Sequence, residues 1–281
     1  MLPIKKLYID SKARTADSRS TTNFAIDLVD SLSMPEGAVF SICDVLVPHT
    51  WYLIDAGRNN NLYFYEAAGS NPGGVAQTRL FSIALDSGNY DGQGLANAIQ
   101  AKINAQTTYY SYAVSFDTLT DKLVIHASIN STAPGVYQWN VLTDTDVTEV
   151  HSITSTPNSL NTFLGNTAKF SVDQNPLVNP PTHYESSRLQ FNPIKYLLIK
   201  SSNLGTFNTL GSFGERTILK KVPVNAPQGA MILDDTRSGN DYLDCGKQAL
   251  KRLEFTITDE RGNIPDLHEH DVSFSLIFSV V

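Results

Sequence analysis

The sequence predicts an all-β protein that is interrupted midway by a small α+β segment. Alternation of apolar and polar residues with a period of two dominates the chain. Clusters of Gly, Pro, Asn and Asp separate the alternating runs, as turns between strands require. Only one segment, residues 93–105, has a strong helical pattern. With 281 residues, the chain can form one large domain or two smaller ones.

The first strands are expected on both sides of a turn at Pro35–Gly37. In segment 23–29 the side chains of Phe24, Ile26 and Leu28 share one face, which is typical of a half-buried strand. Segment 38–47 is almost continuously apolar. That pattern indicates a central strand with both faces covered.

The middle of the chain combines strands with the helix. A strand at 80–85 leads into the helix at 93–105, where Leu95, Ile99 and Ile103 fall on one stripe and Asp91 is the expected N-cap. The pattern then predicts a hairpin and one further strand, at 112–117, 122–127 and 136–142. A second, short helix is expected near 158–164, where Gly165 would end it.

These local connections predict that residues 75–168 fold as an inserted α+β domain. The stretch Gly69–Gly74 marks its entry, and the prolines within 176–181 mark the return of the chain. Residues 1–74 and 169–281 then form a discontinuous domain with around eight strands. Their number and their Pro- and Gly-rich connections predict a single jelly-roll β-sandwich.

The C-terminal segment is the clearest strand in the sequence. Residues 272–280 place Val272, Phe274, Leu276, Phe278 and Val280 on one face, and no charged residue follows Asp271. A long apolar strand exposed at a sheet edge would invite pairing with other chains. We therefore expect this segment either to lie inside a sheet or to be covered by a neighbouring subunit.

Composition and charge exclude some classes of protein. The net charge is −7, and basic residues gather only in dipeptides, so direct binding of nucleic acid is not expected. No apolar run approaches the roughly 20 residues of a membrane-spanning helix, and no signal peptide is visible. Two cysteines, Cys43 and Cys245, without metal-ligand spacing indicate buried free thiols.

No sequence motif of catalysis or cofactor binding is present, so we expect neither an enzyme nor a cofactor. A weak metal candidate is the pair His268 and His270, whose imidazoles would point the same way on an extended chain. A polar loop between strands explains the same residues more simply. A third ligand would have to come from one of four other histidines, His49, His126, His151 and His183.

Carboxylates and aromatic residues leave two alternatives open. Asp234 and Asp235, with Asp241 and Asp244 nearby, could bind calcium or flank a sugar, although such residues more often form a solvated loop. The aromatic runs 51–52 and 63–65 could stack on sugars, although aromatic residues in strands more often belong to a core or an interface. The alternatives are a receptor- or glycan-binding β-sandwich, as in a fibre, tail or lectin, and a glycosidase or lyase.

Several segments together resemble penton-type minor capsid proteins of virophages, Polinton-like viruses and related large DNA viruses. The opening Leu7–Ser11, the polar stretch that follows and Asn23–Phe24 are similar to the start of these proteins. The middle is similar through Gly88–Tyr90, the helix, Phe116–Asp117 and Leu164–Gly165. The second half is similar at three places, 196–202, 218–224 and 253–262.

The resemblance covers most of the chain at the level of pattern, with no single diagnostic motif. It implies a jelly roll that forms homopentamers at the five-fold vertices of an icosahedral virion, beside double-jelly-roll major capsid proteins. It also implies synthesis in the host cytoplasm and no catalytic residues. The inserted domain would be available for contact with a host receptor.

Overall fold

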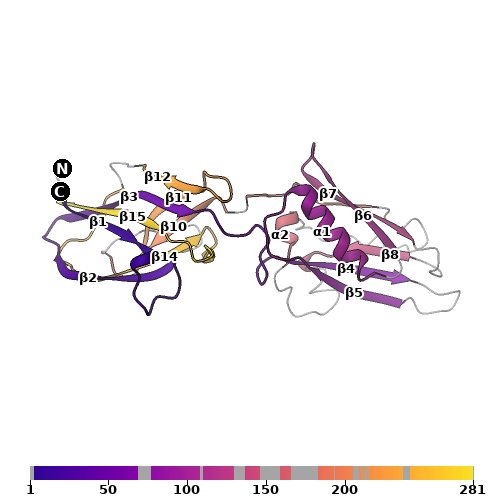
Figure 1. Cartoon of the computed structure of the whole chain (residues 1–281), viewed down its shortest axis with the longest axis horizontal. Coiled ribbons are helices and arrows are strands. Elements are labelled where there is room, and N and C mark those ends of the chain that lie inside the picture. The colour runs from indigo at the N-terminus through magenta and orange to yellow at the C-terminus, as the bar shows by residue number, and fades with distance from the viewer. Residues whose placement is uncertain are drawn as a thin grey trace. The chain divides into compact units, whose positions relative to one another are not determined.

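The computed structural model describes residues 3–68, 77–107, 110–129, 137–145, 159–165, 183–192, 194–204, 209, 211, 214, 216–236 and 241–280. The chain divides into two compact units. Unit 1 contains Met1–Trp51 and Ile194–Val281, and unit 2 contains Tyr52–Pro193. Unit 1 is therefore built from two distant segments of sequence, and unit 2 is the stretch between them (Figure 1).

Unit 1 consists of two antiparallel sheets. Sheet A has the order β1 (Pro3–Asp10), β15 (Ser273–Val280), β3 (Ala38–Pro48) and β12 (Met231–Asp234), and the short β13 (Leu243–Asp244) also pairs with β3. Sheet B has the order β11 (Ile218–Pro223), β10 (Tyr196–Lys200), β14 (Ala249–Asp259) and β2 (Asn23–Ser33). A short 3-10 helix, η1 (Ser11–Ala13), follows β1.

The strand order of unit 1 is that of a jelly roll. When its strands other than β13 are numbered along the chain, sheet A reads 1-8-3-6 and sheet B reads 5-4-7-2. The chain thus passes repeatedly from one sheet to the other, as in two interleaved Greek keys. The predicted fold class, an all-β jelly roll, is confirmed.

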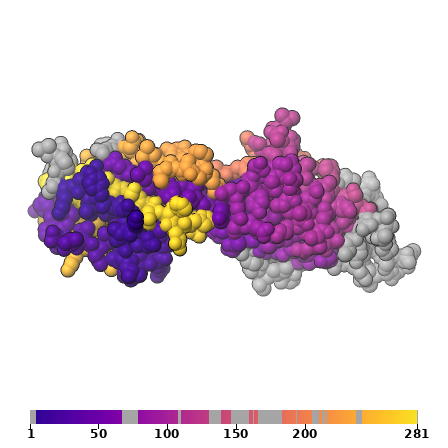
Figure 2. Space-filling model, in the orientation of Figure 1, coloured from indigo at the N-terminus to yellow at the C-terminus, as the bar shows by residue number. Residues whose placement is uncertain are grey.

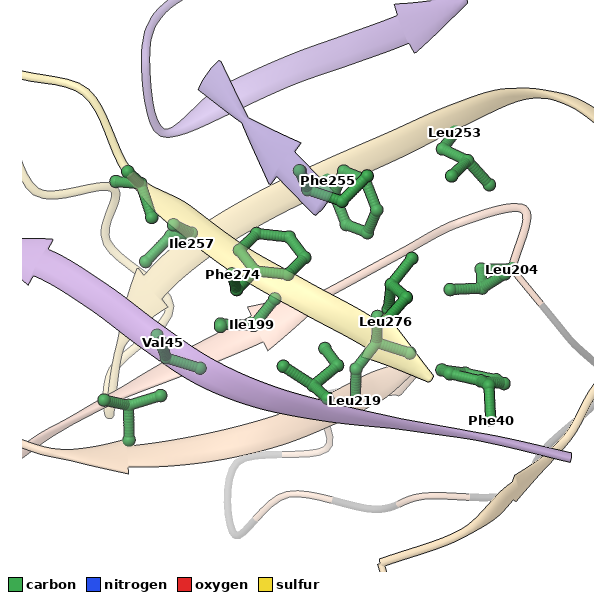
Figure 3. Packing of buried hydrophobic residues seen from close by; sticks show 14 of the residues in the cluster. Phe40, Val45, Ile199, Leu204, Leu219, Leu253, Phe255, Ile257, Phe274 and Leu276 are labelled. Carbon is green, nitrogen blue, oxygen red and sulfur yellow. The ribbon is translucent and has the colours of Figure 1, made fainter. Parts of the chain in front are cut away.

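The core of unit 1 lies between the two sheets (Figure 3). The ring of Phe274, on β15, meets that of Phe255, on β14, edge to face at a centroid distance of 5.0 Å. Leu276 and Phe278 follow Phe274 at every second position and are fully buried. The period-two pattern of the C-terminal segment therefore corresponds to the inner face of sheet A.

Strand β15 lies inside sheet A, between β1 and β3. The sequence left two possibilities open for the C-terminal segment, a position inside a sheet or cover by a neighbouring subunit. The structure shows the position inside a sheet. Pairing on both sides satisfies its backbone groups, so a neighbouring subunit is not needed to cover it.

Unit 2 has two antiparallel three-stranded sheets and a core of its own. One sheet has the order β5 (Gln77–Ala84), β4 (Asn61–Ala68) and β8 (Tyr137–Val141). The other has the order β6 (Tyr110–Asp117), β7 (Lys122–Ile129) and β9 (His183–Glu185). The described part of the unit also contains the helix α1 (Gly92–Asn104) and the single-turn helix α2 (Asn161–Leu164).

Helix α1 forms where the sequence predicts it. Asp91 is the N-cap, and its Oδ1 accepts a hydrogen bond from the backbone N–H of Gly94 at 2.6 Å. The predicted stripe of Leu95, Ile99 and Ile103 is fully buried in the core of unit 2.

The limits of the units lie outside those predicted from the sequence. The predicted insert comprises residues 75–168, whereas unit 2 comprises Tyr52–Pro193. Strand β4 precedes the predicted insert, yet it pairs with β5 and β8 of unit 2. Strand β9 follows the predicted insert, yet it pairs with β7. The Gly-rich stretch 69–74 thus falls within unit 2 and does not mark a boundary.

Candidate assembly surfaces

Strand β12 forms one end of sheet A and exposes apolar side chains. Met231 and Leu233 are 51% and 52% exposed. Leu233 is paired in register with Leu46 on β3, which is also exposed, so the two leucines lie side by side. Exposed large apolar residues grouped on one strand pair are typical of a contact surface for another protein.

A buried ion pair supports this edge from inside. Lys220 comes from β11, at the end of sheet B, and its Nζ lies 3.4 Å from Oδ2 of Asp234 on β12, at the end of sheet A. The same Nζ donates to the backbone carbonyl oxygens of Thr236, at 2.7 Å, and Ile42, at 3.3 Å. The pair therefore joins the two sheets where neither has a further strand among the described residues.

The opposite edge of the sandwich is formed by β1 in sheet A and β2 in sheet B. Tyr8 on β1 is 74% exposed and Val29 on β2 is 99% exposed. The ammonium group of Lys6 lies 4.9 Å from the centroid of the Tyr8 ring and also pairs with Asp44 at 3.1 Å. In Figure 2 the indigo N-terminal residues and the orange β11–β12 region occupy separate parts of the surface of unit 1.

His268 and His270, the weak metal candidates of the sequence, lie in a turn and form hydrogen bonds to the backbone. Positive φ angles at His268 (51°) and Glu269 (62°) form a turn, so the expected extended backbone at this place is wrong. Nδ1 of His268 donates to the Thr50 carbonyl at 2.9 Å, and Nδ1 of His270 donates to the Leu267 carbonyl at 3.0 Å. Each imidazole thus holds a loop through its own backbone contact.

The other proposed ligands lie elsewhere. Asp234 is the buried partner of Lys220, whereas Asp235 beside it is exposed. His49 is buried and donates from Nδ1 to the Ala226 carbonyl at 2.8 Å, and His151 lies outside the described residues. No group of three or more His, Cys, Asp or Glu side chains that could hold a metal ion occurs in the described part of the chain.

The aromatic runs considered as sugar platforms are mainly parts of the two cores. Trp51 is buried in the core of unit 1, where its ring lies 4.2 Å from that of His49. Phe64 is fully buried in the core of unit 2, and Tyr63 is also buried. Only Tyr52 is exposed. Most of the aromatic residues that could have stacked on a glycan are therefore buried and not accessible to one.

Unit 2 contains a buried carboxylate that sequence reasoning missed. Glu66 on β4 is fully buried, and its Oε1 accepts hydrogen bonds from the hydroxyl groups of Thr107, at 2.6 Å, and Tyr112, at 2.8 Å. Burial and the adjacent carboxylate both raise the pKa of Tyr112. A lone Glu in an alternating strand gives no signal of burial, because the hydroxyl groups that donate to it come from distant segments.

Both cysteines are buried and neither forms a disulfide, as predicted from their number and spacing. Burial, with a smaller contribution from the adjacent Asp244, raises the pKa of Cys245 to about 11. Such a thiol is a poor nucleophile, which agrees with a packing role.

Among the described residues, no helix has the length and apolar character needed to cross a membrane.

No family model matches the chain, and no curated protein matches it either. A match is found among solved structures, to the crystal structure of the mavirus penton protein. The two chains share 13% sequence identity with a TM-score of 0.51, and the match covers 99% of this chain and 100% of the other. The resemblance seen in the sequence is thus confirmed at the level of the fold.

Proposed function

We propose that this chain is a penton protein, a structural and non-enzymatic component of a viral capsid. The observation that carries the proposal is the extent of the structural match, which covers nearly all of both chains and so includes the jelly roll and unit 2. The sequence resemblance to penton-type proteins rests on the pattern of the residues and agrees with it. The fold alone does not determine a function, so the proposal needs both the structural match and the sequence resemblance.

In this proposal the chain assembles as a homopentamer at the five-fold vertices of the virion. A ring of identical subunits needs two different surfaces on each subunit, because every contact joins one patch to another. The two edges of the sandwich meet this need: β12 exposes Met231 and Leu233, and the opposite edge exposes Tyr8 and Val29. We therefore assign these edges to the contacts between subunits.

The pentamer would be surrounded by double-jelly-roll major capsid proteins, and the protein would be made in the host cytoplasm before it enters the virion. A host receptor would bind through unit 2. In support of that role, Leu119 at the tip of the β6–β7 hairpin is 93% exposed, and Ile129 at the end of β7 is exposed as well. Apolar side chains at such positions are common in binding surfaces.

Size-exclusion chromatography with light scattering tests the oligomeric state. The expected particle has five times the 30.8 kDa mass of one chain, and negative-stain images should show five-fold rings. Because some rings close only during assembly, the same measurement should be repeated with a major capsid protein of the same virus. A chain that stays monomeric alone and never enters particles with that partner would refute the proposal.

A further inference from the structure

Two histidines of unit 2 face each other across neighbouring strands. His126 on β7 and His183 on β9 are paired in register, and both side chains are exposed. Their ring centroids lie 5.6 Å apart, with an angle of 35° between the ring planes. The sequence offers both residues only as separate, distant candidates for a third ligand to another site. The pairing of β7 with β9 brings them together.

The position of this pair in the ladder brings the side chains close. The carbonyl of Leu123 accepts a hydrogen bond from the N–H of Ser186 at 2.9 Å, so 123 and 186 form a hydrogen-bonded pair. Hydrogen-bonded and non-hydrogen-bonded pairs alternate along an antiparallel ladder. Three positions further, His126 and His183 therefore form a non-hydrogen-bonded pair, in which opposite side chains are nearest.

The distance between the rings suits a shared metal ion. With metal–nitrogen bonds of about 2.1 Å and a tetrahedral angle, the centroids of two ligating imidazoles lie roughly 5 Å apart. The observed centroid distance of 5.6 Å is close to this value. Each neutral imidazole carries one nitrogen with a free lone pair, which is the ligand that Zn²⁺, Ni²⁺ and Cu²⁺ prefer.

Among the described residues, the neighbours of the pair on the sheet leave room for the ion. On the other side of His126, the residue opposite it on β6 is Ala113, whose methyl group cannot cover the rings. Glu185, two residues beyond His183, is held by Lys122 at 2.7 Å. This carboxylate is thus already engaged by the lysine, and water would complete the coordination of the ion.

We propose that His126 and His183 form a binding site for a divalent transition-metal ion that links β9 to β7. Strand β9 has three residues and is paired only with β7 among the described residues. A metal ion bound to both strands would favour the folded state of unit 2, because the pair exists only when the strands are together. The inference does not depend on the proposed penton role.

Isothermal titration calorimetry with zinc chloride tests the site in untagged, full-length protein. We expect one zinc ion per chain to bind to the wild type at this site. Loss of even an outer-shell partner costs about 10- to 100-fold in metal affinity, so His126→Asn and His183→Asn should each weaken binding by roughly 100-fold or more. His270→Asn removes an exposed histidine from unit 1 and should leave the zinc affinity unchanged.

The fluorescence of Trp139, in unit 2, measured in a Trp51→Phe background, shows whether unit 2 of each variant is folded. Without zinc, the wild type, His126→Asn and His183→Asn should unfold at the same temperature. Zinc should raise the unfolding temperature of the wild type and of His270→Asn, each compared with the same protein without zinc, and of no other variant. The proposal fails if the wild type does not bind zinc, or if His126→Asn and His183→Asn, both folded, bind it as the wild type does.

Discussion

At the scale of single residues, the ion pair between Lys220 and Asp234 is a buried polar link between the two sheets of the sandwich. Their side chains are 10% and 3% exposed, so neither charge is well solvated. A buried pair of this kind contributes little net stability compared with an apolar pair of the same size, but removal of one partner leaves the other charge buried alone. The stability of the sandwich edge that carries β12 should therefore be sensitive to substitution of either residue of the pair.

Asp234→Ala should lower the free energy of unfolding of unit 1 by about 3–5 kcal/mol, because Lys220 would remain buried without its partner. Asp235→Ala removes the adjacent, exposed carboxylate and should change stability by less than about 0.5 kcal/mol. Urea denaturation, followed by the fluorescence of Trp51 in a Trp139→Phe background, measures the free energy of unfolding of both variants. Equal effects of the two substitutions would contradict the importance of the pair.

The buried tyrosines of unit 2 predict a loss of stability at alkaline pH. The pKa values of Tyr112 and Tyr184 are raised in the folded chain, mainly by burial, from an ordinary value of 10.0. Above about pH 10 the unfolded chain loses these protons first, so stability is complete below this pH and falls above it, by about 1.4 kcal/mol per pH unit for each tyrosine.

Thermal unfolding followed by Trp139 fluorescence, in a Trp51→Phe background, should show this fall between pH 9 and pH 11. Tyr112→Phe removes one of the two ionising groups and should make the fall less steep. A stability that does not change over this range, or the same slope in wild type and Tyr112→Phe, would show that burial does not control these hydroxyls.

At the scale of the elements, helix α1 covers a free strand edge with two amide side chains. Strand β6 is at the end of its sheet and pairs only with β7 among the described strands. Asn104 accepts from the N–H of Tyr112 and donates to its carbonyl, both at 2.8 Å, and Gln100 accepts from the N–H of Val114 at 2.7 Å. The helix thus satisfies backbone groups that would otherwise invite pairing with another chain.

Asn104→Ala should destabilise unit 2 by about 2 kcal/mol, because it leaves a partly buried N–H and carbonyl of Tyr112 without their partner. Asn97→Ala is the matched control, since Asn97 is an exposed residue of the same helix and Ala is the better helix former. Hydrogen exchange of the Tyr112 amide should become faster in Asn104→Ala only. Unchanged protection of this amide would contradict the role of Asn104.

The two edges of the jelly roll allow a test of the assembly surfaces. Leu233→Glu places a charge on the exposed apolar edge at β12 and should dissociate the proposed pentamer without loss of secondary structure, because the charge would have to leave water at the interface. Leu119→Glu, on the β6–β7 hairpin of unit 2, should leave the oligomer intact. Light scattering distinguishes these results, and a pentamer that survives Leu233→Glu would mean that this edge is not the interface.

At the scale of the whole molecule, the limits of the two units predict which truncations fold. Replacement of residues 52–193 by a short Gly-Ser linker should leave a folded unit 1, because its core clusters only residues of Met1–Trp51 and Ile194–Val281. Removal of 75–168 alone should give an insoluble chain, because β4 would lose both β5 and β8. Circular dichroism and solubility measurements show which of the two truncated chains folds. If the second truncation folds and the first does not, the boundaries are those predicted from the sequence.

The sequence by itself determined the elements and their class. Alternation fixed strands such as β15, because a period of two has one structural meaning when one face is buried, and the capped apolar stripe fixed α1. Only the tertiary structure decided which elements share a sheet: β4 and β9 join unit 2, Asp234 becomes the buried partner of Lys220, and His126 meets His183. The physical reason is that local patterns specify which face of a strand is buried, whereas pairing depends on contacts between residues far apart in the chain.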